Sequence, residues 1–172
     1  GQPFDEYLKN RFGSADNIEP VLQHLAAEGK GVGIDFRFDL LRHVPNTVQL
    51  HQLLQLADAR GLDQSTLAEG LLSAFFEDGR NIGDRDELID IVAAHGLSAD
   101  DVMAAAESDR LRQIVLSREA QARSSGLVGV PGYLMNRRLL VVGAQSTDVM
   151  INAFDQAMFG AGTDSLVSPT LH

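Results

Sequence analysis

The sequence predicts an α/β protein in which a long, mostly helical region precedes a short β-hairpin and one last helix. Two observations support this fold class. Apolar residues recur with helical spacing through residues 1–125, as they do on the buried faces of amphipathic helices. After residue 125 a loop with glycine and proline, 129–132, leads to a continuous apolar run, 139–142, which is typical of a strand covered on both faces. We therefore expect a helical domain at 1–125, a hairpin and helix at 126–160, and a flexible tail at 161–172.

The first two helices are predicted from their apolar stripes. The first stripe has i, i+4, i+8 spacing and is followed by a helix-ending glycine: Phe4, Leu8, Phe12 and Gly13. We expect Asn17 to cap the second helix, because Pro20 then falls in the first turn, where no N–H is needed. The apolar face of this helix consists of Ile18, Val21, Leu22 and Leu25.

A glycine-rich run, 29–33, should end the second helix. It superficially resembles a phosphate-binding loop, but it follows a helix instead of a strand, so we interpret it as a connector. Beyond it, Ile34, Phe36 and Phe38 alternate with charged residues. This alternation predicts a short, half-buried extended segment over 34–39.

The next two helices should form the centre of the helical region. Asn46 or Thr47 can start a helix that Gly61 ends, with an inward face of Leu50, Leu53, Leu54 and Ala57. The following helix, at about 64–77, is apolar around much of its circumference, which predicts a central position.

Two of the three further helices have clear starting signals. Asp84 with Glu87, and Ser98 with Asp101, have the spacing of capping boxes. A helix from about 109 to 124 then leads to the loop at 129–132. Because acidic groups at helix starts complement the helix dipole, capping explains these clusters without catalysis.

The hairpin cannot cover its own apolar residues, because a lone two-stranded hairpin is marginal in water. The last helix should cover one face with Val149, Met150, Ala153, Phe154 and Ala157. We therefore predict that the sheet is incomplete in this chain.

Composition limits the classes of function. The 172 residues include 24 acidic and 14 basic ones, a formal charge of −10, which argues against nucleic acid or an anionic membrane as a partner. With no cysteine, the chain has no disulfide, no thiolate metal site and no cysteine nucleophile. The histidines do not form a ligand pair at helical spacing, so no metal is expected. A signal peptide and a membrane-length apolar run are both missing, and we expect a cytoplasmic protein.

Several stretches together resemble one family. The Gly-Val-Pro of 129–131 before a hairpin, with Gly143-Ala144-Gln145 before the last helix, is similar to the DsbA family of the thioredoxin superfamily, in its FrnE-like branch. Four earlier stretches follow in the same order as in that family: 4–8, 33–36, 45–47 with His51, and 74–82. The resemblance implies a helical insertion domain plus the C-terminal hairpin and helix of a thioredoxin-like fold. Members of the family begin with a strand, a Cys-x-x-Cys loop on a helix and a second strand, and this part is lacking here.

The resemblance also implies a site. In this family a cis-proline faces the dithiol, and the backbone before it pairs with an extended substrate peptide. Val130, Pro131 and Gly132 would then bind substrate, with Pro131 supporting catalysis and no catalytic residue in the chain itself. Gly132 is smaller than the residue expected after the proline. His51 is a further candidate for substrate binding, although a histidine beside an apolar stripe is more often a packing residue.

The function implied is that of a FrnE-type protein thiol–disulfide oxidoreductase or isomerase without its redox dithiol, acting on protein or peptide thiols without a cofactor. Two alternatives stay open. One is an enzyme like the glutathione-dependent 2-hydroxychromene-2-carboxylate isomerase, which would use glutathione. The other is a cysteine-free helical module that binds a peptide or protein and covers its hairpin edge by forming a homodimer.

Overall fold

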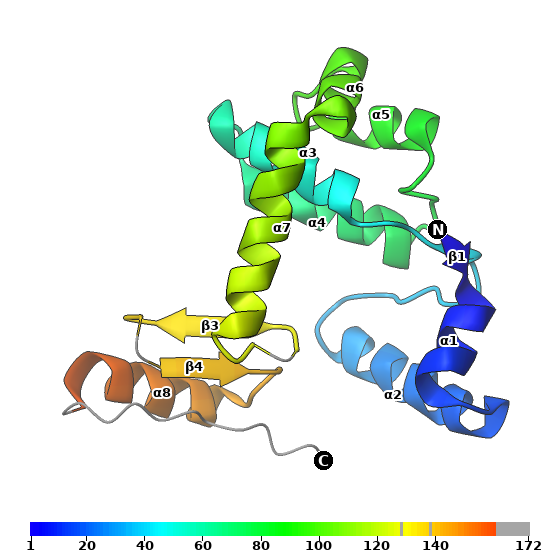
Figure 1. Cartoon of the computed structure of the whole chain (residues 1–172). Helices are drawn as coiled ribbons and strands as arrows, with labels where there is room; N and C mark the ends of the chain where they lie inside the picture. Colours follow the sequence, from blue (N-terminus) through cyan, green and yellow to red (C-terminus); the bar gives the residue numbers. More distant parts are fainter. Residues whose placement is uncertain (128, 138, 161–172) are drawn as a thin grey trace. The chain divides into compact units, whose positions relative to one another are not determined.

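A computed structural model describes residues 1–127, 129–137 and 139–160 of the chain (Figure 1). The elements that it contains are, in order, β1 (Gln2–Pro3), α1 (Phe4–Phe12), α2 (Ala15–Gly31), β2 (His43–Val44), α3 (Val48–Ala59), α4 (Gln64–Phe76), α5 (Arg85–Ala93), α6 (Ala99–Glu107), α7 (Asp109–Ser124), β3 (Gly132–Met135), β4 (Leu139–Val142) and α8 (Thr147–Phe159). The predicted class, a mostly helical region followed by a hairpin and a helix, is confirmed. The predicted tail at 161–172 lies outside the described residues.

The chain divides into two compact units, and the division falls within α7. The first unit is Gly1–Leu116, and the second begins at Ser117. The boundary that we expect between 125 and 126 rests on the change from helical to strand pattern, and it stays a prediction. None of the described helices is both long and apolar enough to cross a membrane.

The core of the first unit lies among α3, α4, α5 and α6. α4 packs against both α3 and α5, which agrees with its predicted central position, and α6 packs against α3 and α5 (Figure 1). The fully buried positions come from every one of these helices, and they include Leu53, Leu67, Val92 and Val102. Each predicted helix face therefore supplies part of one shared core.

Aspartate or serine side chains cap the starts of α4, α5 and α6. Asp63 accepts hydrogen bonds from the backbone N–H groups of Ser65 and Thr66 at the start of α4. Ser98 and Asp101 form a complete capping box on α6, as predicted. Asp84 caps α5 by accepting from the N–H groups of Asp86 and Glu87.

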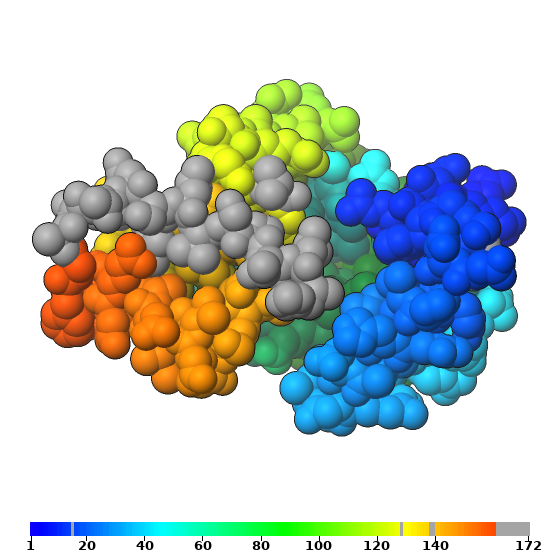
Figure 2. Space-filling model, turned by 90° about the horizontal axis from the view of Figure 1, so that it is seen from below, coloured from blue at the N-terminus to red at the C-terminus, as the bar shows by residue number. Residues whose placement is uncertain are grey.

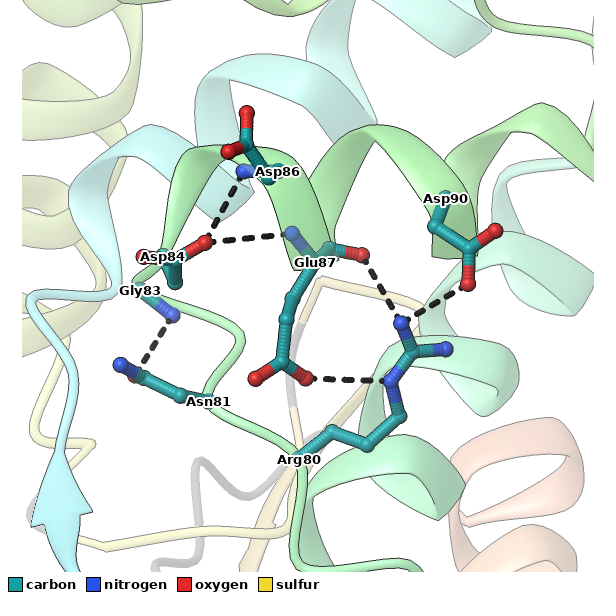
Figure 3. A network of polar contacts seen from close by, with 7 residues as sticks. All are labelled: Arg80, Asn81, Gly83, Asp84, Asp86, Glu87 and Asp90. Carbon is teal, nitrogen blue, oxygen red and sulfur yellow. Dashed lines mark hydrogen bonds and ion pairs between the residues drawn. The ribbon is translucent and has the colours of Figure 1, made fainter.

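The Glu87 carboxylate does not complete a capping box at Asp84; it is taken up by Arg80, as Figure 3 shows. Arg80 Nε donates to Glu87 Oε2 at 3.1 Å, and its terminal nitrogen donates to Asp90 Oδ2 at 2.8 Å. These bonds, the one to Asp90 first, raise the pKa of the Arg80 guanidinium. The contact ties the loop after α4 to the exposed side of α5.

Two predictions in the N-terminal part are wrong. α2 begins at Ala15, and Pro20 lies inside the helix instead of in its first turn. Asn17 is not the cap, because its side chain donates to the carbonyl oxygen of Phe12 and so links α2 to the end of α1. The glycine-rich run 29–33 ends α2 as predicted, since the last residue of the helix is Gly31.

Residues 34–37 do not form a strand. Their backbone bonds to the end of α4 instead, with Arg37 N–H donating to the carbonyl oxygen of Phe76 at 2.7 Å. The Phe36 and Phe38 rings stack with centroids 5.3 Å apart, and Phe76 meets both edge-on. The apolar alternation thus reflects aromatic packing against a helix end, not pairing with another strand. The short β1–β2 pair, which the sequence did not indicate, joins Gln2 to Val44 instead.

One buried polar residue of the first unit has a defined structural role. Gln52, on α3 between core positions, is almost fully buried. Its Nε2 donates to the carbonyl oxygens of Ala105 at 2.7 Å and Ser108 at 3.2 Å. The side chain thereby links α3 to the end of α6 and to the residue that separates α6 from α7.

The second unit contains the antiparallel hairpin β3–β4 and α8. The register pairs Gly132 with Val142 and Met135 with Leu139. Met135 and Val141 pack against Ala153, with Met150 and Ala157 at the margin. Two predicted contributors do not take part: Val149 and Phe154 are exposed, because the narrow hairpin meets only one part of the apolar arc of α8.

Candidate substrate-binding site

The loop before β3 begins at a helix C-terminus. α7 ends at Ser124, and Gly126 follows with a φ of 90°, the left-handed conformation that glycine adopts most readily. The N–H of Leu127 donates back to the carbonyl oxygen of Ala122 at 3.1 Å. Gly126 therefore acts as the predicted helix-ending residue, and it turns the chain sharply out of α7.

The candidate residues Val130, Pro131 and Gly132 lie together at the start of β3. The Val130–Pro131 peptide bond is cis, and the Val130 side chain is 87% exposed. The carbonyl oxygen of Pro131 accepts a 2.7 Å hydrogen bond from Gly143 N–H, which extends the hairpin ladder by one step. The loop is thus anchored on the β4 side while Val130 projects into solvent.

The Leu127 side chain lies next to the backbone at position 132. A Cβ atom added to Gly132 would overlap the Leu127 side chain, which lies against this backbone. Leu127 therefore occupies the space that a larger residue after the proline would need. The contact between Leu127 and Gly132 depends on the turn made at Gly126, and the sequence did not indicate it.

β3 has an accessible edge. It pairs with β4 on one side, and no other described strand lies along its second edge. Tyr133 and Leu134, next along the strand, are both exposed. An edge strand with free backbone groups is a template for pairing with another extended segment.

The hairpin is fixed to α8 at its far end. Asn136 and Arg137 form the turn, with φ values of 50° and 58°. The side-chain amide of Asn136 donates to the carbonyl oxygen of Ala157 at 2.7 Å. This residue satisfies a carbonyl group in the last turn of α8, a role that sequence reasoning missed and that only the folded hairpin brings about.

His51 lies apart from these residues in the sequence and belongs to the first unit. It is in the first turn of α3, where its N–H donates to the carbonyl oxygen of Thr47. Its side chain is exposed, so it is not a packing residue of the core. Nearby, Asn46 accepts from Val48 N–H at 3.1 Å and helps to begin α3. The substrate-binding role of His51 stays a prediction.

The chain offers few groups for chemistry. Within the described residues no cluster of three histidine or acidic side chains is arranged to hold a metal ion. The sequence has no cysteine, so this chain cannot itself supply a thiolate for disulfide exchange. What the loop and β3 can supply is a surface for an extended peptide.

The chain has a helical region, a proline loop, a hairpin and a helix that covers the hairpin. This order of elements defines the class of protein as a partial thioredoxin-like fold. The chain matches the DSBA-like thioredoxin domain over residues 5–155 and belongs to this family of thiol–disulfide oxidoreductases. The match runs from α1 into α8, so it includes the candidate loop.

Two solved structures are similar. A probable DsbA oxidoreductase from Streptomyces coelicolor is 29% identical, with a TM-score of 0.78 over 96% of this chain and 71% of the other. A candidate protein disulfide isomerase from Nitrosomonas europaea has a TM-score of 0.64 and 14% identity, over 84% of this chain and 73% of that one, and indicates a common fold alone. No curated protein matches the chain.

Proposed function

We propose that this chain is the substrate-holding part of a FrnE-type thiol–disulfide oxidoreductase. An extended peptide of the substrate protein pairs with the backbone at Val130 and along the free edge of β3. Pro131 and Gly132 shape the start of this surface, and the dithiol that performs the exchange belongs to a segment outside residues 1–172.

The observation that carries the proposal is the exposed Val130 at the beginning of a strand whose second edge has no partner in the described part of the chain. Addition of a peptide strand to a sheet edge supplies affinity through backbone hydrogen bonds, which accept many sequences. That property suits a protein whose substrates share a disulfide rather than a motif. The exposed Tyr133 and Leu134 would favour apolar peptide side chains.

The FrnE-type assignment rests on Gly143-Ala144-Gln145 before α8. In the structure Gly143 has a φ of 84° and the Gln145 side chain donates to the carbonyl oxygen of Val142 at 3.0 Å. These residues shape the turn from β4 toward α8. The Streptomyces protein extends beyond the part that this chain covers, which is consistent with a dithiol on another segment.

Peptide binding can be tested on the chain as it is, with fluorescein-labelled, carboxymethylated insulin B chain as an extended probe. Val130→Pro removes one backbone donor, and we expect a two- to tenfold weaker affinity, because a hydrogen bond contributes about 0.5–1.5 kcal/mol. Val130→Thr keeps the branched shape and the N–H, so it should bind like the parent chain.

Equal binding of the probe by the parent and Val130→Pro, with unchanged circular dichroism, would count against this edge as the peptide site. An equal loss in both variants would show that the Val130 side chain, not the backbone, makes the contact.

A second candidate function is peptide binding without any chemistry, which the lack of cysteine favours. Intact mass and thiol titration of the protein from its native source would distinguish the oxidoreductase function from peptide binding alone. A mass near 18.6 kDa without thiols favours the binding module. A heavier protein with two thiols favours the oxidoreductase.

A further inference from the structure

The loop that presents Val130 is held at both ends by backbone hydrogen bonds. At its start, Leu127 N–H donates to the carbonyl oxygen of Ala122 at 3.1 Å. At its end, the carbonyl oxygen of Pro131 accepts from Gly143 N–H at 2.7 Å. Val130 contributes little to fixing the loop, because its side chain is 87% exposed. The orientation of the Val130 backbone therefore depends on other contacts of the loop.

One such contact is made by an apolar side chain and joins the two ends of the loop. The half-buried Leu127 side chain lies against the backbone of Gly132, where a Cβ atom would overlap the Leu127 Cδ1 atom. Leu127 is the residue directly after the turn at Gly126, and Gly132 is the first residue of β3. The Leu127 side chain thus connects the end of α7 to the start of the strand.

This contact lies on the face of the hairpin opposite α8. Met135 and Val141 pack on α8, and side chains alternate along a strand, so Gly132 and its partner Val142 belong to the other face. A Cβ atom added to Gly129 would lie 3.8 Å from Val142 Cγ1, an ordinary contact distance. α8, drawn in orange and red on the outer surface in Figure 2, covers the first face. The loop therefore folds across the face that α8 leaves uncovered.

The backbone at position 132 does not itself require glycine. Gly126 and Gly143, on either side of the hairpin, have φ values of 90° and 84°, but the φ of Gly132 is outside the left-handed region. A side chain is therefore conformationally allowed at 132, and Leu127 fills that space from the other side of the contact.

We propose that Leu127 is the positioning residue for Val130. This inference rests on the proposed function, in which a peptide pairs with the backbone at Val130, and it adds what holds that backbone in place. The Leu127 side chain packs on Gly132 and keeps the loop in one conformation. The Val130 backbone is then already oriented when the peptide arrives, and a site that is ordered beforehand loses less conformational freedom on binding.

Binding of the labelled insulin B chain by variants of the whole chain measures this role. Leu127→Ala removes the atoms that reach Gly132, and we expect an affinity about tenfold weaker. Leu127→Met keeps an apolar side chain of similar length and should bind within about twofold of the parent chain. The matched control is Ile151→Ala, which truncates a 51% exposed apolar side chain of α8. It should also bind within about twofold of the parent.

A second measurement reports on Val130 without any peptide. The order parameter of the Val130 amide, from nitrogen relaxation, should fall in Leu127→Ala, whereas that of the Val141 amide in β4 should stay the same. General loosening of the second unit would lower both values. The double variant Leu127→Ala with Gly132→Leu returns a side chain to the same space from β3. It should restore the order of Val130 and bring the affinity to within about threefold of the parent chain.

An unchanged Val130 order parameter in Leu127→Ala would overturn the proposal, and so would an unchanged affinity in a variant whose Val130 order has fallen. A double variant as disordered at Val130 as Leu127→Ala would show that the contact with Gly132 does not hold the loop. If Leu127→Ala loses the β4 hydrogen bonds, the smaller truncation Leu127→Val takes its place, with the same expected direction of each effect. Failure of the proposed function gives a different result: the parent chain and Val130→Pro then bind the insulin B chain equally, while the Val130 order parameter still follows the residue at 127.

Discussion

The two units of the chain bury their apolar residues to very different extents. In the first unit, fifteen buried residues form one cluster that includes Leu53, Leu67 and Val92. In the described part of the second unit, the cluster has three buried residues, Met135, Val141 and Ala153. Among the described residues, five large apolar side chains are exposed in the much longer first unit and eight in the second. The eight are Val130, Tyr133, Leu134, Val149, Ile151, Phe154, Met158 and Phe159.

This contrast indicates that the first unit is structurally self-sufficient and the second is not. A packed helical core can stabilise a small domain, whereas a two-stranded hairpin needs further strands or helices. The apolar residues that the described part of the second unit exposes lie at the start and edge of β3, where we propose that a peptide binds, and on α8.

A matched pair of substitutions tests the contrast directly. Val92 and Val141 are both 0% exposed, one in each unit. Val92→Ala should cost about 2 kcal/mol of unfolding free energy, because it removes two methyl groups and leaves a cavity in a closely packed core. Val141→Ala should cost less, about 1 kcal/mol, because its small cluster can relax around the change.

Urea unfolding followed by circular dichroism reports the loss at Val92, and hydrogen exchange of the β4 amides reports the loss at Val141. Leu72→Ala, at an exposed position of α4, is the control and should be close to neutral. Equal losses at Val92 and Val141 would mean that the second unit is as tightly packed as the first.

The sequence predicted the helical unit well because its signals are local. The capping residues Ser98 and Asp101, the apolar stripe of α4 and the glycine at 126 each depend on neighbours within a turn or two. The α7 bounds at 109–124 agree with the prediction for the same reason. The Gly-Val-Pro loop was identified through the family resemblance. The helix end predicted at Gly126 then placed this loop directly after α7.

The errors arose where distant residues compete with local ones. Asn17 could cap a helix, but its amide reaches the end of α1. Residues 34–37 alternate like a strand, yet Arg37 N–H bonds to the carbonyl oxygen of Phe76 at the end of α4 instead of to another strand. Phe154 belongs to the apolar arc of α8, and only the width of the hairpin decides that it remains exposed.

A prediction about pH concerns the cap of α6. Arg60 and then the Ser98 backbone N–H bond to the Asp101 carboxylate and lower its pKa below the ordinary 3.8. A lowered pKa in the folded state gives stability that is present above the unfolded-state value and is lost as the pH falls through the folded-state value. The first unit should therefore become less stable in acid.

Asp101→Asn should cost about 1 kcal/mol at pH 7, because it weakens the hydrogen bond from Ser98 N–H and removes the ion pair with Arg60. The difference from the parent chain should shrink as the pH is lowered below 3.8, because the parent carboxylate then becomes protonated as well. Urea unfolding over a pH series measures this convergence. Asp100→Asn, in the same first turn of α6 but exposed, is the control. A constant difference at every pH would show that the Asp101 charge does not contribute.

The smallest predicted effect is a gain in the second unit. Arg137 has a φ of 58° at the second position of the hairpin turn, a conformation that costs an ordinary residue more than glycine. Arg137→Gly should stabilise the hairpin by about 0.5 kcal/mol, after the added freedom of glycine in the unfolded chain is subtracted. Asn136→Gly provides the matched comparison: it relieves the same kind of backbone strain but removes the bond to Ala157, so it should bring no gain. Slower exchange of the β4 amides in Arg137→Gly alone would show that the turn limits this weakly packed unit, whereas slower exchange in both variants would mean that the Asn136 bond to α8 contributes little.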